Sequence, residues 1–511
     1  MAKYKDYSYD QTMMIPVSFE KQVLPGTFEH TLCYLIDQKV DLSIFANRYE
    51  NDYTGAPAYD PAILLKIILY AYSKGIISSR KIARLCQENI VCMAIAADTR
   101  PHFTTIADFI STHHKECASL FSMIISTAHS QGLIGQNMFA IDGCKISSNC
   151  SKEWSGTKQE LFNKAKKLEK SVNNLIQKHK MIDKTNDDES LRRKEEKAIR
   201  KRQAEADKIF DWLGSHCEKI GSSNQPIKSN IVDNESAKLS SSHGVVQGYN
   251  GVAAVDDKQQ VIVWADAYGD ANESGHLPEI LEGIDRSCKD AHINEDALHS
   301  VTITADTGFH NKRNMEYIHE NDIDAYIPDN QFRKRDVRFE NADKHKKKVE
   351  NWKPKKGKNY FRPEDFTFDE SGTLICPAGL PMKPKASNVG KGGNRYRGKC
   401  YRSDEENCRD CPLRPKCIRK ETTKIRQVSF LKEACGRDGA NPVQEMKDKI
   451  DTPNGRAIYS KRMSTVEPVF GHIRGMKHLD HFTMRGRQKV KTQWLLFCMV
   501  HNIGKMKKCW F

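Results

Sequence analysis

Apolar positions recur at helical spacing through the first part of the chain, residues 1–135. Asp60-Pro61 favours a helix start, because Asp can cap the first turn and Pro suits the first helical position. Apolar residues then return every three or four positions. Residues 77–86 form a second helical pattern, and a third helix is predicted to start near Thr104. These patterns predict a helical domain.

The second of these predicted helices is basic, with Arg80, Lys81 and Arg84. Helix, turn and helix with basic residues on one member fits DNA binding, because Arg and Lys contact phosphates. A plain helical bundle produces the same pattern. We expect residues 1–135 to bind DNA through these three side chains.

The period of the pattern changes near residue 138, where apolar runs of strand length begin. Strands are predicted at residues 139–146, 249–255, 261–267, 301–305 and 323–327. Helices are predicted at residues 276–284 and 312–319, with a later helix-like segment at 464–471. The order predicts an α/β fold with a mixed sheet, extending over residues 136–511.

Two segments interrupt this predicted sheet, and the first, residues 152–215, is rich in Lys, Arg and Glu. From Leu161 to Ile182, apolar residues alternate four and three positions apart, which predicts a helix with a coiled-coil seam. Residues 183–189 are the predicted turn and 191–212 the returning helix. Such a hairpin is either a solvated pair or a contact surface for DNA or a partner, and the sequence leaves both open.

The second interruption, residues 330–430, opens with a basic stretch that reaches Lys356. It then carries five cysteines: Cys376, Cys400, Cys408, Cys411 and Cys417. The two-residue spacing of Cys408 and Cys411 lets two thiolates hold one Zn²⁺, and two others would complete a structural four-cysteine site. Free cysteines in a small subdomain are the competing interpretation.

The net charge of the chain indicates which kind of molecule it binds. The chain has 511 residues, with 81 Lys and Arg against 66 Asp and Glu, a formal net charge of +15. That excess favours a polyanion, because binding to phosphates releases counterions. No run of about 18 apolar residues predicts a membrane span, and the 16 cysteines are scattered as in a reduced protein. We expect a cytoplasmic protein without membrane contact.

Three acidic residues carry the chemistry. Asp142 and Asp306 each close an apolar run, and Glu467 lies in the later helix-like segment. Taken singly, they have plainer interpretations as a turn residue, a helix cap and a surface acid. Strand ends and a later helix can bring them to one point, where carboxylates repel one another unless a cation holds them. Oxygen ligands favour Mg²⁺ or Mn²⁺, which predicts metal-assisted phosphoryl transfer on nucleic acid.

The segment around Glu467 also holds candidate DNA contacts: Tyr459, Arg462, Arg474 and Lys477. Arg474 follows Glu467 by seven residues, which in an α-helix is two turns along the same face. Pro468 fits if the helix starts at Thr465, because first-turn residues need no backbone donor. We expect Arg474 to hold a DNA phosphate beside the metal site.

These motifs resemble those of the DDE transposases of bacterial insertion sequences, with an InsH-type N-terminal domain and an RNase H-like catalytic core. The matching pieces are Phe139-Ala140-Ile141-Asp142-Gly143, Val246-Gln247-Gly248-Tyr249-Asn250, Thr304-Ala305-Asp306-Thr307-Gly308-Phe309, Tyr459 to Gly471 and Cys408-Arg409-Asp410-Cys411-Pro412-Leu413. The resemblance covers nearly the whole chain. It implies that Asp142, Asp306 and Glu467 are catalytic and bind metal.

The family signature around the glutamate is Tyr, two residues, Arg, three residues, Glu, six residues and Lys. Here Tyr459 and Arg462 are correctly spaced, four residues precede Glu467, and Arg474 replaces the usual Lys. An Arg keeps the charge but grips phosphate with a planar fork. The extra residue leaves the role of Arg462 open.

The resemblance implies strand cleavage and joining on double-stranded DNA, at transposon ends and target, with two Mg²⁺ or Mn²⁺ ions and no covalent protein intermediate. It also implies a homodimer or larger assembly on DNA. His276 and His310 lie near the acidic motifs in sequence, and we expect structural or phosphate-contacting roles for them.

Three other functions stay open. An RNase H-like nuclease would use the same acids and cut DNA without joining it. A transposase-derived DNA-binding protein would have lost catalysis, although all three acids are present. A tyrosine recombinase would use Tyr459 as nucleophile and would not need Asp142 and Asp306.

Overall fold

The computed structural model describes residues 17–48, 57–182, 189–221, 224–241, 244–271, 273–336, 338, 360–391, 396–420, 422–433 and 441–507. Contacts divide the chain into two compact units. The first joins Met1–Asp329 to Thr452–Phe511, and the second is Asn330–Asp451. We call them the sheet unit and the cysteine unit.

The first part of the sheet unit is helical, as predicted. Its elements are η1 (Glu20–Gln22), α1 (Phe28–Gln38), η2 (Leu42–Arg48), α2 (Pro61–Ser73), α3 (Ser79–Glu88), α4 (Ile90–Ile95), α5 (Phe103–Thr112) and α6 (His114–Ser130). The Asp60 carboxylate accepts the Ala62 N–H at 2.8 Å, which confirms the predicted cap. Helix α2 is almost wholly buried, and its Lys66 is paired with Asp37 at 2.6 Å.

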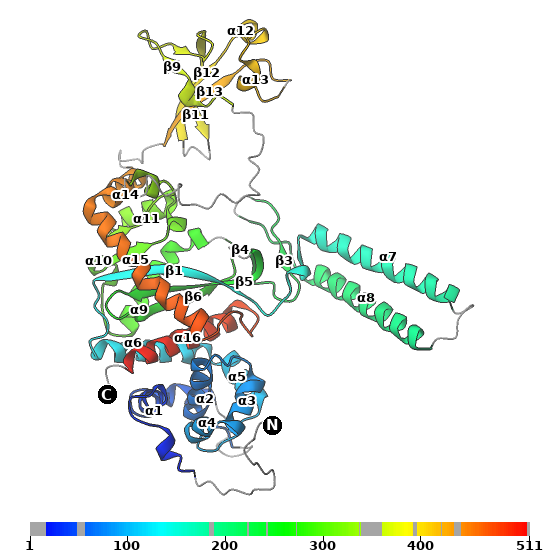
Figure 1. Ribbon diagram of the computed structural model, residues 1–511, viewed down its shortest axis with the longest axis vertical. Coiled ribbons are helices and arrows are strands. Elements are labelled where there is room, and N and C mark those ends of the chain that lie inside the picture. Colours follow the sequence, from blue (N-terminus) through cyan, green and yellow to red (C-terminus); the bar gives the residue numbers. More distant parts are fainter. Residues whose placement is uncertain are drawn as a thin grey trace, which may run out of the picture. The chain divides into compact units, whose positions relative to one another are not determined.

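A mixed sheet follows, and it contains all five predicted strands (Figure 1). They are β1 (Met138–Ser147), β5 (Gly244–Asp256), β6 (Ile262–Tyr268), β7 (Thr302–Ala305) and β8 (Ala325–Tyr326), joined by an unpredicted β4 (Ala237–Ser241). The strand order is β4-β5-β1-β7-β8, and β6 also pairs with β5. Strands β5 and β6 run antiparallel to their neighbours, whereas β1, β7 and β8 are parallel. The predicted mixed α/β fold is confirmed.

The helices that accompany the sheet are η4 (Glu273–Gly275), α9 (Leu277–Asp290), α10 (Ala297–Ser300), η5 (Thr307–Phe309), α11 (Lys312–Glu320), α15 (Pro453–Gly471), the π-helix η10 (His472–Met476) and α16 (Arg487–Met506). Helix α16, which the sequence analysis did not single out, links the N-terminal helices to the sheet. Its Phe497 stacks on Tyr72 of α2 with ring centroids 4.4 Å apart, and its Trp494 indole donates to the Val252 carbonyl at 3.0 Å. The two parts therefore share one core.

The first interruption is the predicted helical hairpin. It starts with η3 (Lys152–Trp154) and β2 (Ser155–Gly156), continues through α7 (Lys158–Ile182) and α8 (Glu189–Ser215), and returns at β3 (Ser229–Asn230). Leu161 and Ala165 of the predicted seam are buried against Ile209 and Trp212 of α8. The predicted turn falls almost wholly outside the described residues.

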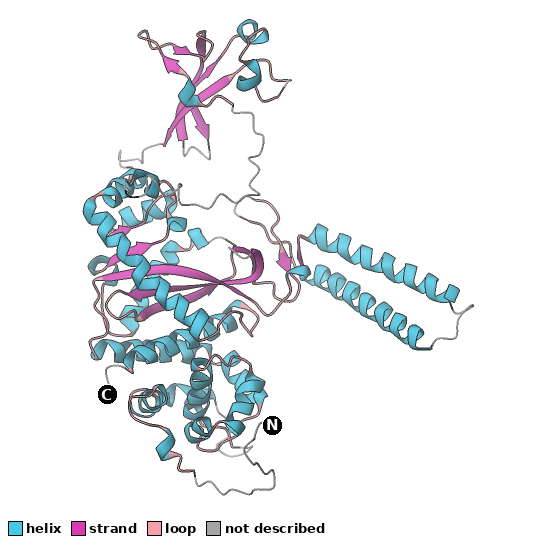
Figure 2. Cartoon of the chain, in the orientation of Figure 1, coloured by secondary structure: helices cyan, strands magenta, loops and turns pink. Residues whose placement is uncertain are grey.

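The cysteine unit has its own antiparallel sheet (Figure 2), in the order β13-β12-β11-β10-β9. Its elements are η6 (Phe332–Arg335), η9 (Pro363–Asp365), β9 (Thr367–Phe368), β10 (Leu374–Ile375), β11 (Pro381–Lys391), β12 (Tyr396–Arg402), α12 (Glu405–Arg409), α13 (Arg414–Cys417), β13 (Gln427–Glu433) and α14 (Pro442–Asp451). A small core of Phe366, Leu374, Met382, Tyr401 and Val428 supports it. Most of the predicted basic stretch lies outside the described residues.

No described helix is both long and apolar enough to cross a membrane.

Candidate active site

Strand register brings the two aspartates together. Strands β1 and β7 are parallel and pair as far as Ile141 with Ala305. Asp142 and Asp306 are the residues that directly follow this last pair. Strand β7 ends there, but β1 continues to Ser147. The prediction that Asp142 marks a strand end was therefore wrong, because β5 keeps pairing with β1 beyond it. Both aspartates nevertheless lie where β7 ends.

Helix α15 supplies Glu467 and packs against β1, β7 and β8. Asp306 and Glu467 both raise the pKa of Asp142, so the charge of each reaches the Asp142 carboxylate. Burial raises that pKa most, and Arg462 and the Gly143 N–H lower it. The structure thus brings the three sequence-predicted acids together.

Arg462 is buried beneath this acid cluster. Its side chain is buried, its guanidinium pairs with Asp142 at 3.0 Å, and its Nε–H donates to the Ile141 carbonyl at 3.3 Å. A buried guanidinium is not exposed to DNA. Its contacts instead fix the position of the Asp142 carboxylate and offset part of its charge.

A fourth acid, Glu273 of η4, was missed by the sequence analysis. Its carboxylate accepts a hydrogen bond from the Asn250 amide and lies over Gly143, where any larger side chain would collide with it. Burial is the main cause that raises the pKa of Glu273, and Asp142 and Asp306 raise it further. No periodic pattern marks Glu273, but Asn250 belongs to one of the matched motifs.

Two asparagines hold the loop of Glu273 against the loop that follows Asp306. The side-chain amides of Asn311 and Asn314 donate to the Ser274 carbonyl at 3.0 and 2.7 Å. Glu273 is thereby fixed beside the strand ends without lying on a strand. This tertiary contact explains why spacing along the sequence gave no signal.

The donor chemistry of this cluster fits a hard divalent cation. Its ligand atoms are carboxylate oxygens, and their mutual repulsion is the kind that a cation relieves. The Asn250 Oδ1 atom is buried there without a hydrogen-bond partner in the part of the chain described. No group of three or more His, Cys, Asp or Glu among the described residues already stands in a metal-holding arrangement.

The helix that carries Glu467 differs from the prediction. It starts at Pro453, capped by Thr452, so Pro468 lies in its interior and not in its first turn. Proline has no N–H for the Ser464 carbonyl four residues earlier. That carbonyl accepts the Gln260 amide at 2.8 Å instead, which explains how the interior proline is tolerated.

Directly after α15 the chain forms the π-helix that carries Arg474. The seven-residue same-face argument therefore fails, because it assumes an unbroken α-helix. Arg474 is exposed. Burial raises the pKa of Cys144, two residues beyond Asp142 on β1, and the charge of Arg474 offsets part of that rise. Arg474 consequently still lies on the side of the acid cluster.

The other predicted DNA contacts are spread over the sheet unit. Tyr459 is half-buried on α15, and Lys477 is half-buried, donating to the Ser73 carbonyl at 3.1 Å. Arg80, Lys81 and Arg84 are exposed on α3. DNA contact by these residues stays a prediction.

The two histidines have structural partners. His276 bonds with Asp270 at 2.8 Å and Glu279 at 3.2 Å, and the Asp270 bond is the main cause that raises its pKa. His310 bonds through Nδ1 to the Ile327 carbonyl at 2.8 Å. These contacts give both side chains a structural role.

Of the five cysteines predicted to bind zinc, four lie around one cavity and the fifth does not. Cys376, Cys408, Cys411 and Cys417 line one cavity in the cysteine unit. Cys400 is buried on β12, paired in the sheet, and does not line that cavity.

Comparison with known families gives two matches. Residues 17–112 match a transposase domain (DUF772), and residues 375–507 match a transposase DDE domain. The second match includes the cysteine cavity and Glu467, whereas Asp142 and Asp306 precede it. No curated protein and no solved structure matches the chain. The helical N-terminal part is therefore similar to a DUF772 transposase domain, and the segment that carries Glu467 is similar to a transposase DDE domain.

Proposed function

We propose that this protein is a transposase that binds the ends of an insertion sequence and carries out metal-dependent strand cleavage and strand transfer at Asp142, Asp306 and Glu467. One observation carries the proposal. The β1–β7 register and helix α15 bring Asp306 and Glu467, from distant segments, within range of the Asp142 carboxylate. An RNase H-like core is the fold that we propose for this sheet, supported by the antiparallel pairing of β1, β5 and β6 and the parallel pairing of β1, β7 and β8.

Asp142, Asp306 and Glu467, joined by Glu273, would hold two Mg²⁺ or Mn²⁺ ions. Such ions polarise a phosphoryl oxygen and activate an attacking oxygen when bound. Arg462 holds the Asp142 carboxylate in place through its 3.0 Å ion pair. Asn250 orients Glu273 toward the cluster. Asp142 and Glu273 must be ionised to take part, and their raised pKa values make that dependent on pH.

Exposed basic residues would bind the DNA backbone. Arg474 lies on the side of the acid cluster, and the exposed face of α3 offers Arg80, Lys81 and Arg84. We further propose that the protein acts as a dimer or larger assembly on nucleoid DNA in the bacterial cytoplasm, because strand transfer requires two transposon ends together.

Strand cleavage and joining on labelled DNA from the element's own ends, with MgCl₂, tests the proposal. Wild type should give joined products and Asp306→Asn none, whereas Glu320→Gln, an exposed acid on α11, should behave as wild type. Cutting without joining would favour a nuclease. Equal activity of Asp306→Asn and wild type would overturn the assigned site, and a phosphotyrosyl-DNA adduct would indicate a recombinase.

A further inference from the structure

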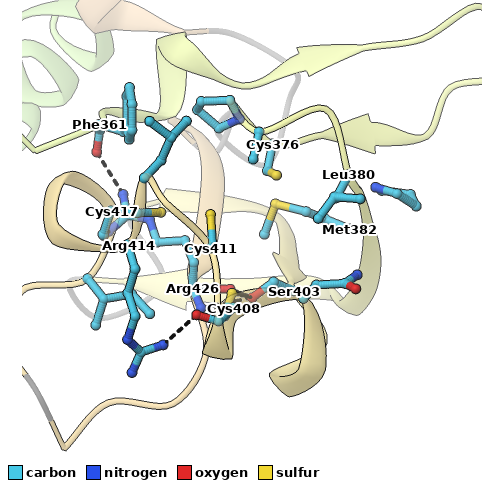
Figure 3. A pocket seen from close by; sticks show the side chains of 16 residues that line it. Phe361, Cys376, Leu380, Met382, Ser403, Cys408, Cys411, Arg414, Cys417 and Arg426 are labelled. Carbon is cyan, nitrogen blue, oxygen red and sulfur yellow. Dashed lines mark hydrogen bonds between the residues drawn. The ribbon is translucent and has the colours of Figure 1, made fainter.

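Four cysteines from three separate segments surround one small cavity in the cysteine unit (Figure 3). Cys376 follows β10 at a turn, Cys408 lies in α12, Cys411 follows that helix, and Cys417 ends α13. The cavity has a volume of about 30 Å³. That is room for one water-sized or ion-sized occupant and too little for an organic ligand.

The four thiols line the same cavity. All four are free cysteines and none is paired in a disulfide. Four uncombined thiols gathered in this way would repel one another as thiolates, unless a cation neutralises them.

Two arginines tie the cysteine-bearing segments together. The Arg414 guanidinium donates to the Cys408 carbonyl at 2.8 Å and to the Thr423 carbonyl at 2.9 Å. Arg426 donates to the Cys417 carbonyl at 3.2 Å and to the Phe361 carbonyl at 2.9 Å. Both side chains line the cavity, so they place positive charge beside sulfur atoms that would be negative when bound to metal.

One of these arginines has a donor to spare. The Arg426 Nε–H is buried and has no hydrogen-bond partner within the described residues. A metal-bound thiolate accepts such a hydrogen bond better than a neutral thiol does. The two arginines beside the cavity therefore favour four thiolates over four neutral thiols.

From this arrangement we infer that Cys376, Cys408, Cys411 and Cys417 bind one structural Zn²⁺ ion in the cysteine unit. Four thiolates satisfy the tetrahedral preference of Zn²⁺ and leave no open coordination position. Among the described residues no three of these side chains already stand as metal ligands, so the four thiols must turn about χ1 to meet at one ion. Cys400 is the cysteine left over, because it is fixed in the middle of β12.

The core of this unit gives a physical reason for such an ion. Its cluster has five buried side chains, with Cys376 and Cys417 packed at its margin. Small cores rarely supply enough stability alone, and a structural metal is a common remedy. The inference is independent of the acid cluster, which lies in the other unit.

Metal analysis of the full-length protein, purified reduced and without added metal, tests the inference. We expect about one zinc per chain, falling by about tenfold or more in Cys411→Ser. Cys217→Ser, an exposed cysteine of the sheet unit, is the matched control and should keep its zinc, and so should Cys400→Ser.

Because loss of a ligand can unfold the cysteine unit, a second measurement uses the wild type alone. Replacement of zinc by Co²⁺ should give the intense sulfur-to-cobalt charge-transfer absorption of a tetrahedral thiolate site. Wild type without zinc and without that absorption would overturn the inference. Zinc retained by a folded Cys411→Ser, or a disulfide found among the four cysteines by mass spectrometry, would also overturn it.

Discussion

The acid cluster and the cysteine cavity are two candidate metal sites with different ligand atoms, oxygen in the first and sulfur in the second. The first uses carboxylates on a large, well-supported sheet, and its segments are distant in sequence. The second uses thiols on short elements between Cys376 and Cys417. Carboxylates suit an exchangeable hard cation that meets DNA, whereas four thiolates suit a closed site that holds a fold together. The chain thus has separate candidate sites for a catalytic metal and for a structural metal.

The largest effect should come from Asp142→Asn. Loss of one charged ligand should lower strand transfer by about 10³-fold, because metal stabilisation of the transition state is worth several kcal/mol. Gel assays with labelled ends and MgCl₂ measure it, with Asp211→Asn, an exposed acid of α8, as control. Zinc content should not change. A fall in zinc would show that the two sites are not separate.

Arg462→Met should combine a loss of activity with a loss of stability. Breaking the buried pair with Asp142 should lower the free energy of unfolding by about 3 kcal/mol, because it strands a partly buried charge. Urea unfolding of the sheet unit, followed by its tryptophan fluorescence, measures this. Lys461→Met changes the exposed neighbour and should be close to neutral. Equal stability of the two variants would contradict the positioning role of Arg462.

Glu273→Gln tests the fourth acid. The amide keeps the shape and can still bond with Asn250, but the charge is lost, so Mn²⁺ affinity should fall by about 10- to 100-fold. Titration of Mn²⁺ by electron paramagnetic resonance measures it independently of activity. Glu279→Gln, at the start of α9, is the control. Unchanged Mn²⁺ affinity with intact strand transfer would remove Glu273 from the site and leave the other three acids in place.

The smallest effect is a pH dependence. Burial raises the pKa of both Asp142 and Glu273, so the folded chain binds their protons more tightly than the unfolded chain does. Without a cation, these two groups therefore cost stability as pH rises from about 4 through their folded pKa values. Mg²⁺ binds only the ionised forms. The rise in Tm caused by MgCl₂ should grow with pH across that window, by a few degrees.

Thermal unfolding with and without MgCl₂ across the pH range measures this, and Asp142→Asn should flatten the dependence. A chelator specific for zinc should, by contrast, lower the stability of the cysteine unit at neutral pH without abolishing the Mg²⁺ effect. A Mg²⁺ stabilisation that is independent of pH would contradict the assignment of these acids.

The sequence by itself determined the elements and much of the chemistry. Apolar periodicity predicted the N-terminal helices, the hairpin seam at Leu161 and Ala165 and all five principal strands. These follow from local spacing, because a helix or strand repeats its buried face at a fixed period. The same local patterns singled out Asp142, Asp306 and Glu467 as candidate acids and found the CxxC pair.

Tertiary structure decided which of these residues meet. The partner of Asp142 is Arg462, and Glu273 reaches the cluster only because Asn250, Asn311 and Asn314 hold its loop there. Pro468 was expected in the first turn of its helix, but α15 starts at Pro453 and Pro468 lies in the helix interior. The Gln260 amide satisfies the carbonyl that this proline leaves unpaired. Contacts of this kind join side chains with no fixed spacing in the sequence, so no periodic pattern can encode them.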